Sequence, residues 1–206
     1  MKNIILITIP LLVLACNEDP KLNFAYEVKV EDHYSEQPLE GRTVILKKCE
    51  GGGLVSGTPP CDSINFEITD IEGIVNFNGR FKRGFGNGHE FLVLGGKEYP
   101  TTTNIRNWGQ SENTIIQLKP LVDTKSQISS SNEIDSLSIW ISAGGYRPIY
   151  LFFNVNDSLV TDLTMIPDQE NQIGIAAYNN DTFVGRETLY FTPVYKGENK
   201  LVYKFK

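Results

Sequence analysis

The stretch Phe24-Ala-Tyr-Glu-Val-Lys-Val-Glu31 carries an aromatic or aliphatic side chain at every second position, with Ala, Glu or Lys in between. Successive side chains of a β-strand point to opposite faces, so this alternation is typical of a strand with one buried face. The same alternation returns at Ile64, Phe66 and Ile68, where we also expect the apolar side chains to be buried.

Outward from this stretch, further strands are predicted over residues 43–46, 74–77, 91–94 and 114–118. Between two of them, Asp70 is placed to accept backbone N–H bonds within a turn and Gly73 to adopt a positive φ. No long stretch beyond residue 16 has helical periodicity. Short strands separated by Gly, Pro and Asn turns predict an all-β protein built as a β-sandwich.

A polar, serine-rich segment interrupts this pattern in the middle of the chain. It contains Thr124-Lys-Ser-Gln-Ile-Ser-Ser-Ser-Asn132, and its composition predicts a linker over residues 123–135. Six candidate strands follow within residues 136–206, a unit of immunoglobulin-like size. We therefore expect two β-sandwich domains, over residues 22–122 and 136–206.

The first residues have the order of a secretory signal. Lys2 precedes an apolar run that begins at Ile4 and ends with Val13-Leu-Ala-Cys16. A basic residue, a short apolar run and a small residue at the cut are typical of a signal peptide, here residues 1–15. The run is too short to span a bilayer comfortably as a permanent helix.

The cysteine directly after the small residue resembles the lipobox of bacterial lipoproteins. This resemblance implies cleavage before Cys16, acylation of its thiol by palmitate or a similar chain, and a lipidated tether over residues 16–21. An ordinary signal peptide with a chance cysteine at the cut is the alternative. The acidic tether Asn17-Glu-Asp-Pro20 resembles a surface-export signal of one group of Gram-negative bacteria, or is simply a solvated linker. We expect a lipid-anchored protein of the outer membrane, exposed at the cell surface, with the periplasmic face as the alternative.

The net charge of the chain limits the classes of partner that it can bind. The formal net charge is −6, and an acidic surface repels nucleic acid and anionic lipid headgroups. Contact with the membrane must then come from the lipid anchor. We expect no nucleic-acid partner, and a glycan or another surface protein as the remaining candidates.

Two longer segments of the first unit carry a family resemblance: Pro38-Leu-Glu-Gly-Arg-Thr-Val-Ile-Leu46 and Ile68-Thr-Asp-Ile-Glu-Gly-Ile-Val-Asn-Phe77. With Lys97-Glu-Tyr99 and Ile116-Gln-Leu118, they resemble a transthyretin-like domain of the carboxypeptidase regulatory-like type, which is related to the CnaB domains of surface proteins. The resemblance covers residues 22–122. It implies a fold and carries over no catalytic residue.

If Cys16 carries lipid, Cys49 and Cys61 remain as a pair in an exported protein, where disulfides persist. Their spacing is neither C-x-x-C nor a zinc pattern. We expect a structural disulfide, with a redox or metal pair as the alternative.

The sequence offers little for catalysis. It has two histidines, His33 and His89, both of which we expect at the surface, and it has no G-x-S-x-G motif. We therefore expect a protein that is not an enzyme, with no catalytic residue, no cofactor and no metal site.

The alternation in the second unit predicts an aromatic surface. With Leu137, Ile139 and Ile141 inside, Trp140 faces out, and across the next turn Tyr150 and Phe152 face out as well. An exposed aromatic cluster is a glycan platform or a protein interface. The alternative is that a second sheet or the first domain covers it.

Three Asp-Ser-aliphatic sites, at Ser63, Ser136 and Ser158, resemble an O-glycosylation motif of some Gram-negative exported proteins. Together these features predict a membrane-anchored surface lipoprotein that acts as a non-catalytic binding or display module. The first unit would be a stalk and the second would present the contact surface. The alternatives are a glycan-binding accessory protein or small glycan-active hydrolase, and a structural subunit of a surface assembly.

Overall fold

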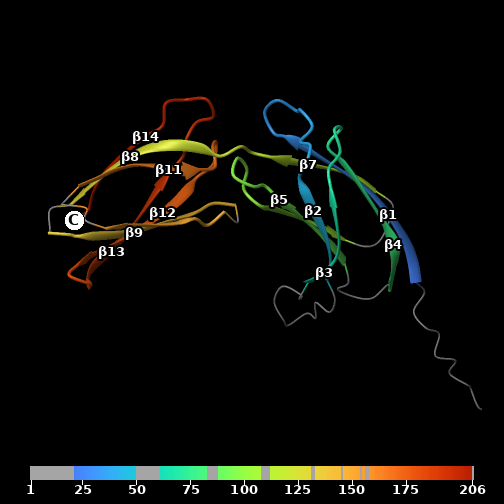
Figure 1. Ribbon diagram of the computed structural model, residues 1–206, viewed down its shortest axis with the longest axis horizontal. Helices are drawn as coiled ribbons and strands as arrows, with labels where there is room; N and C mark the ends of the chain where they lie inside the picture. The colour runs from blue at the N-terminus through green and yellow to red at the C-terminus, as the bar shows by residue number, and fades with distance from the viewer. Residues whose placement is uncertain are drawn as a thin grey trace, which may run out of the picture.

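A computed structural model describes residues 21–49, 61–82, 88–107, 112–130, 133–144, 146–153, 155 and 158–205 (Figure 1). The predicted signal peptide, Cys16 and the tether up to residue 20 lie outside these residues. The regular structure of the described part is entirely β-strand. Within it, no helix is long and apolar enough to cross a membrane.

The first unit contains seven of the described strands: β1 (Lys21–Asp32), β2 (Thr43–Cys49), β3 (Cys61–Ile68), β4 (Ile74–Lys82), β5 (Gly88–Leu94), β6 (Thr102–Asn107) and β7 (Glu112–Leu118). The second unit contains another seven: β8 (Val122–Ser130), β9 (Ser136–Ser142), β10 (Ile149–Phe153), β11 (Ser158–Met165), β12 (Asn171–Asn179), β13 (Thr182–Phe191) and β14 (Lys200–Phe205).

The two units have the same strand order. In the first, the sheet β4-β1-β7 packs on the sheet β3-β2-β5-β6, and in the second β11-β8-β14 packs on β10-β9-β12-β13. Counted from the start of each unit, both read 4-1-7 and 3-2-5-6. In both, the first strand pairs parallel with the last, β1 with β7 and β8 with β14. The expected all-β fold with two sandwiches is confirmed, and the second unit follows the order of the first instead of the A-B-E-D and C-F-G order of an immunoglobulin constant domain.

The segment expected as a linker is a central strand. β8 pairs with β11 on one side and with β14 on the other, and Thr124, Ser126 and Ile128 on it are buried. The expectation of a linker over residues 123–135 is therefore wrong. The buried Ser126 hydroxyl has a local partner, since it donates to the Thr124 carbonyl oxygen at 3.1 Å, whereas the buried Thr124 hydroxyl has none within the described residues. The true connection between the units is residues 119–121.

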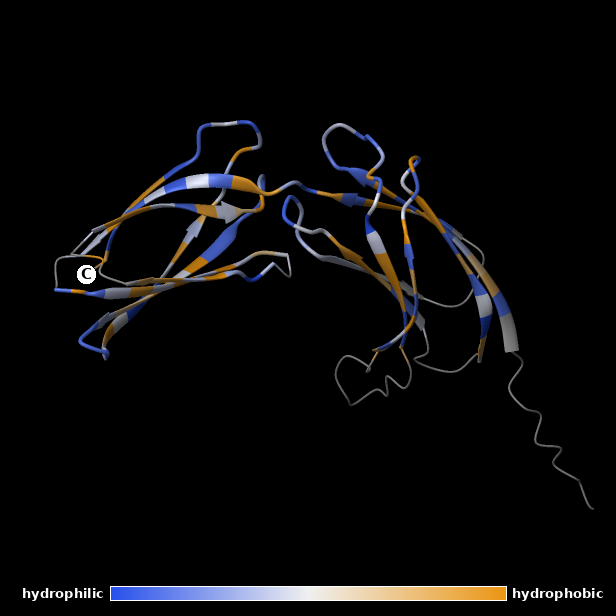
Figure 2. Ribbon diagram, in the orientation of Figure 1, coloured by the Kyte–Doolittle hydropathy of each residue, from blue (hydrophilic) through white to orange (hydrophobic). Residues whose placement is uncertain are grey.

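Each sandwich has its own hydrophobic core, and Figure 2 shows how apolar and polar residues alternate along the strands. The predicted inward face of β1 is confirmed, with Phe24, Tyr26, Val28 and Val30 all buried. The core of the first unit comprises Phe24, Tyr26, Val28, Val30, Val44, Leu46, Val75, Phe77, Phe81, Phe91, Val93, Tyr99, Ile116 and Leu118. That of the second comprises Ile128, Ile134, Leu137, Ile139, Ile141, Val155, Leu163, Met165, Ile173, Ile175, Ala177, Leu201 and Phe205.

The expected burial of the apolar face of β3 is wrong. β3 is the edge strand of its sheet, and the side chains of Phe66 and Ile68 are 66% and 62% exposed. Phe66 pairs with Ile45, whose neighbours Val44 and Leu46 point into the core, so Ile45 and Phe66 share the outer face. The alternation correctly predicted a strand, but it did not show which side of the sheet its apolar residues would occupy.

The turn that follows β3 forms as predicted. The Asp70 Oδ1 atom accepts the backbone N–H groups of Glu72 at 2.9 Å and of Ile74 at 2.8 Å. Gly73 has a φ of +75°, and a Cβ there would meet the Val30 carbonyl oxygen. The turn carries the chain from the sheet that contains β3 to the sheet that contains β4.

Candidate functional site

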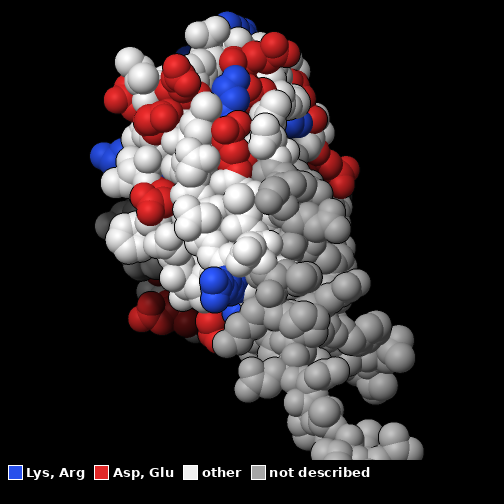
Figure 3. Space-filling view, turned by 90° about the vertical axis from the view of Figure 1, so that its right-hand side faces the viewer, with Lys and Arg blue, Asp and Glu red and all other residues white. Residues whose placement is uncertain are grey.

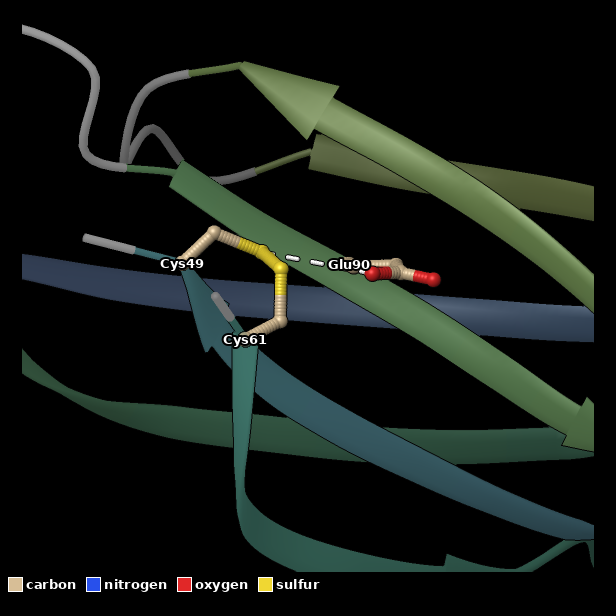
Figure 4. Close-up of side chains that lie close together, drawn as sticks. All are labelled: Cys49, Cys61 and Glu90. Atoms are coloured by element: carbon tan, nitrogen blue, oxygen red, sulfur yellow. Dashed lines mark hydrogen bonds between the residues drawn. A yellow bond between two sulfur atoms is a disulfide. The ribbon is translucent and has the colours of Figure 1, made fainter. Parts of the chain in front are cut away.

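The predicted disulfide is confirmed. Cys49 ends β2 and Cys61 begins β3, the two residues lie opposite each other in the sheet, and their sulfur atoms are 2.02 Å apart (Figure 4). The Glu90 carboxylate on β5 lies 4.0 Å from the Cys49 sulfur. Within the described residues, these three side chains are the one group with a geometry that could hold a metal ion. A cysteine binds metal as the thiolate, so neither sulfur is a ligand while the disulfide is intact.

The two histidines occupy different environments. His33 is exposed, as expected, and its Nδ1 atom lies 3.1 Å from the Gln117 Oε1 atom. The expected surface position of His89 is wrong, because its side chain is only 1% exposed. Its ring packs against the rings of Phe24, Tyr26 and Phe81.

The polar contacts of His89 are few. The Tyr26 hydroxyl lies 2.7 Å from the Nδ1 atom, and within the described residues the buried Nε2 atom has no hydrogen-bond partner. Burial, followed by the positive charge of Lys48, lowers the pKa of His89 below its ordinary value. These surroundings make His89 a neutral core residue instead of a base poised beside a nucleophile.

The three residues of the predicted aromatic platform do not share a face. In the pairing of β9 with β10, Tyr150 lies opposite Ile139 and Phe152 opposite Leu137, so both aromatic rings point toward the core. The Tyr150 hydroxyl accepts the backbone N–H of Thr164 at 3.1 Å. The prediction that Tyr150 and Phe152 face outward is corrected, because the inward position gives a polar hydroxyl a backbone partner and buries both rings.

Trp140 does occupy the outer face, beside different neighbours. It lies opposite Ile149, which is 69% exposed, and Leu151 on the same strand is 63% exposed. The indole lies directly against Gly174, where a Cβ would collide with it, and the Arg186 guanidinium lies over the ring, 4.3 Å from its centroid. Trp140 is therefore a half-buried ring with neighbours on the sheet and above it.

The three predicted glycosylation sites lie on strands. Ser63 on β3 and Ser158 at the start of β11 are exposed, while Ser136 is half-buried and its hydroxyl donates to the Asp135 carboxylate at 3.0 Å. Their modification remains a prediction.

An aromatic clamp joins the two sandwiches. The ring of Tyr34, which follows β1, stacks on the ring of Tyr195, which follows β13, with centroids 3.7 Å apart and planes 4° from parallel. The Tyr34 hydroxyl donates to the Asp168 Oδ2 atom at 2.6 Å. Tyr34 thus binds two separate loops of the second unit, and the sequence contained no signal that placed these three residues together.

Hydrogen bonds within the second unit hold Asp168 in place beside Tyr195. Asp168 has a φ of +53°, its backbone N–H donates to the Pro193 carbonyl oxygen at 2.8 Å, and its Oδ1 atom accepts the Tyr195 N–H at 3.4 Å. The bond from Tyr34 lowers the pKa of the Asp168 carboxyl. Burial, followed by the neighbouring Asp168 carboxylate, raises the pKa of Tyr34. The pair is therefore ionised at Asp168 and protonated at Tyr34 at neutral pH.

A cleft of about 330 Å³ lies at the same junction. The β5–β6 loop of the first sandwich faces the β9–β10 turn of the second across it (Figure 1). The residues that line the cleft are Gly96, Tyr99, Pro100, Thr101, Tyr146, Arg147 and Pro148.

The two tyrosines of the cleft have raised pKa values. Burial, followed by the hydrogen bond to Asp32, raises the pKa of Tyr99 to about 12. Burial, followed by the neighbouring Tyr150, also raises the pKa of Tyr146. Both tyrosines thus stay protonated at neutral pH, so the titratable side chains of this cleft suit binding better than proton transfer.

The surface of the first sandwich is mostly uncharged or acidic on the face that Figure 3 shows. This agrees with the formal net charge of −6. The chain has 19 Lys and Arg residues against 25 Asp and Glu, so the cationic Arg147 in the cleft has the less common sign of charge.

No family model and no curated protein matches the sequence. Among solved structures, a streptococcal ancillary pilin aligns at 9% identity and a TM-score of 0.42, over 90% of this chain, which spans 62% of that protein. The shaft pilin SpaA from Lactobacillus rhamnosus GG aligns at 8% identity and a TM-score of 0.29, over 91% of this chain and 98% of its own. A DUF3823 family protein from Bacteroides uniformis aligns at 8% identity and a TM-score of 0.28, over 81% and 95%. Scores of this size transfer neither an activity nor a partner to this chain.

Proposed function

We propose that this protein is a lipid-anchored, non-catalytic display module of the bacterial surface, in which the first sandwich is a stalk that carries the second away from the membrane. The observation that carries this proposal is the parallel pairing of the first and last strands in both sandwiches. Parallel strands run in the same direction, so each unit receives the chain at one pole and releases it at the other.

Two such units in series form an extended body. β1 begins at one end of the molecule and β14 lies in the sandwich at the other end (Figure 1). A lipid on Cys16, a few residues before β1, would therefore be attached to the pole farthest from the second sandwich. An anchor at one pole and a surface at the other is the arrangement that a display protein needs.

The junction favours a fixed separation over a flexible one. Only residues 119–121 lie between β7 and β8, and the Leu121 N–H donates to the Glu98 carbonyl oxygen at 2.6 Å. The Leu121 bond holds the connection to the first unit, and the stack of Tyr34 on Tyr195 is a direct contact between the two units. Interdomain motion is the default for two domains with a small interface, and these contacts restrain it.

Metabolic labelling with a palmitate analogue tests the anchor. The full chain should take up label and fractionate with membranes, and Cys16→Ser should lose the label and become soluble. Cys61→Ser is the matched control, because it removes a cysteine outside the lipobox and should keep the label. Wild-type protein that takes up no label would refute the anchor.

Protease treatment of intact cells tests the location. A surface-exposed protein is cleaved in intact cells, whereas a protein on the periplasmic face is cleaved only after the outer membrane is permeabilised. Protection in intact cells would refute the display role at the cell surface while leaving the lipid anchor in place.

A further inference from the structure

We propose that the cleft between the two sandwiches binds a saccharide unit that carries a carboxylate, with Arg147 holding the carboxylate and the ring of Tyr146 packing against the saccharide. This inference does not depend on the lipid anchor or on the side of the membrane that the protein faces. It assigns a ligand class to residues outside the aromatic surface predicted from the sequence.

The two tyrosines of the cleft differ in exposure, because Tyr146 is half-buried whereas Tyr99 belongs to the core of the first sandwich and is 8% exposed. The Tyr99 hydroxyl donates to the Asp32 Oδ2 atom at 2.9 Å, within the first sandwich. Tyr150 of the second sandwich is a neighbour of Tyr146 and contributes to the raised pKa of its hydroxyl. The Arg42 guanidinium lies 4.9 Å from the centre of the Tyr99 ring and covers it, so the Tyr146 ring is what supplies carbon surface to a ligand. Aromatic rings of this kind pack against flat, partly apolar ligands at little cost in conformational entropy.

Arg147 supplies the charge. Its side chain is exposed, and within the described residues it makes no ion pair or hydrogen bond, in contrast to Arg42, which pairs with Glu98 at 3.2 Å. A guanidinium remains charged at any physiological pH and offers parallel N–H donors that match the two oxygens of a carboxylate. A neutral ligand would leave this charge unused.

The remaining lining favours a small polar ligand. The volume of about 330 Å³ is at the lower end of the range for small-molecule sites. Thr101, which carries a hydroxyl, and Gly96 are also among the lining residues. A ring with hydroxyls on its edges and a carboxylate at one end matches this mixture better than a purely apolar molecule does.

The site is largely formed before a ligand arrives. Pro100 and Pro148, one on each wall, have fixed φ angles, and Ala143 and Tyr146 close the β9–β10 turn with backbone bonds at 3.1 and 2.8 Å. The stack of Tyr34 on Tyr195 joins the same two sandwiches that supply the walls. A preformed site binds with less loss of conformational entropy than one that must be ordered.

Calorimetric titration of the full chain with three probes tests the proposal. D-glucuronate carries both the ring and the carboxylate, D-glucose only the ring, and acetate only the carboxylate. We expect glucuronate to bind in the millimolar range or tighter, and glucose and acetate each to bind about tenfold more weakly or worse, as loss of one charge-assisted contact or one stacked ring implies.

Variants locate the site. Arg147→Gln should weaken glucuronate binding about tenfold and leave the weak binding of glucose unchanged. Tyr146→Phe should retain binding and Tyr146→Ala should lose it, because the ring is what lines the cleft. Arg80→Gln is the matched control, since Arg80 is an exposed arginine on β4, outside the cleft, and its loss should change nothing.

Three results would overturn the proposal: no heat of binding with glucuronate at tens of millimolar, equal affinity for glucose and glucuronate, or unchanged glucuronate binding by Arg147→Gln. Arg147 is exposed, so the variant should melt at the wild-type temperature, and a circular dichroism melt checks that it does. The palmitate and protease experiments above are unaffected by these outcomes, so each proposal can fail separately.

Discussion

The ring of Tyr34 in the first sandwich lies face to face with the ring of Tyr195 in the second, 3.7 Å between centroids, while its hydroxyl donates to Asp168 at 2.6 Å. One side chain therefore contacts two loops of the neighbouring unit. An aromatic pair contributes about 0.5–1.5 kcal/mol beyond the area it buries, which is enough to bias the angle between two small domains.

Removal of the Tyr34 ring should loosen the junction without unfolding either unit. For Tyr34→Ala we expect a broader distribution of maximum dimensions in small-angle X-ray scattering, because one of the two restraints between the sandwiches is lost. Tyr34→Phe is the matched control, since it keeps the stack, loses only the bond to Asp168, and should scatter much like the wild type. A Tyr34→Ala profile that superimposes on the wild-type profile would show that residues 119–121 fix the geometry alone.

Removal of the disulfide should destabilise the first sandwich. Cys49 and Cys61 are 12 residues apart, and in the chain-entropy model closure of a loop of this size is worth about 3 kcal/mol. The double change Cys49→Ser and Cys61→Ser should lower the free energy of unfolding of the first unit by about that amount, measured by urea denaturation. The transition of the second unit should stay where it is, because the bond lies outside it.

Stability should fall as the pH drops below about 6.5, the ordinary histidine pKa. Burial lowers the pKa of His89 in the folded chain, so between that lowered value and 6.5 the unfolded chain binds the proton and the folded chain does not. The free energy of unfolding is therefore highest above pH 6.5. It decreases progressively as the pH falls toward the pKa of His89 in the folded chain. Urea titrations between pH 5 and pH 8 would measure it.

Two variants isolate this effect. His89→Phe should abolish the slope between pH 5 and 6.5, while His33→Gln, which changes the exposed histidine, should retain it. Glu31 and Asp32 are buried carboxylates whose pKa values lie below their ordinary values, so they titrate at lower pH and do not account for a slope in this window. An unchanged slope in His89→Phe would contradict the assignment.

The orientation of β10 gives a further prediction. The Tyr150 hydroxyl is the acceptor for the Thr164 N–H, so Tyr150→Phe should lower the free energy of unfolding of the second unit by about 1–3 kcal/mol. Leu151→Ser is the contrasting change, because Leu151 is 63% exposed and its loss should cost less than about 0.5 kcal/mol. The reverse ranking in thermal or urea melts would mean that the strand faces the other way.

Local pattern alone predicted much of the fold. The alternation at Phe24, Tyr26, Val28 and Val30 correctly placed a strand with its inner face, because an apolar set spaced by two can be buried only as one face of a sheet. The turn at Asp70 was predictable for an equally local reason, since a short acidic side chain reaches the N–H groups of its own turn.

Composition misled where the position in the sheet decided the outcome. The serines of residues 124–132 were expected in a linker, yet β8 pairs with a strand on each side and buries Thr124 and Ser126 beside Ile128. Likewise, Phe66 and Tyr150 both lie in alternating stretches, but one is exposed on an edge strand and the other packs against a core. Periodicity shows that a strand has two faces and leaves open which one the rest of the chain covers.

The sequence by itself determined that the chain is built of strands and that its first residues resemble a lipoprotein signal, and it predicted the disulfide between its two later cysteines that the structure contains. Only the tertiary structure decided that the two units share one strand order and that Tyr34 meets Asp168 and Tyr195. It alone placed Tyr99 beside Arg147 in one cleft. These residues lie far apart along the chain in separately folded units. Their contact depends on how the two sandwiches are joined at residues 119–121, which no local spacing encodes.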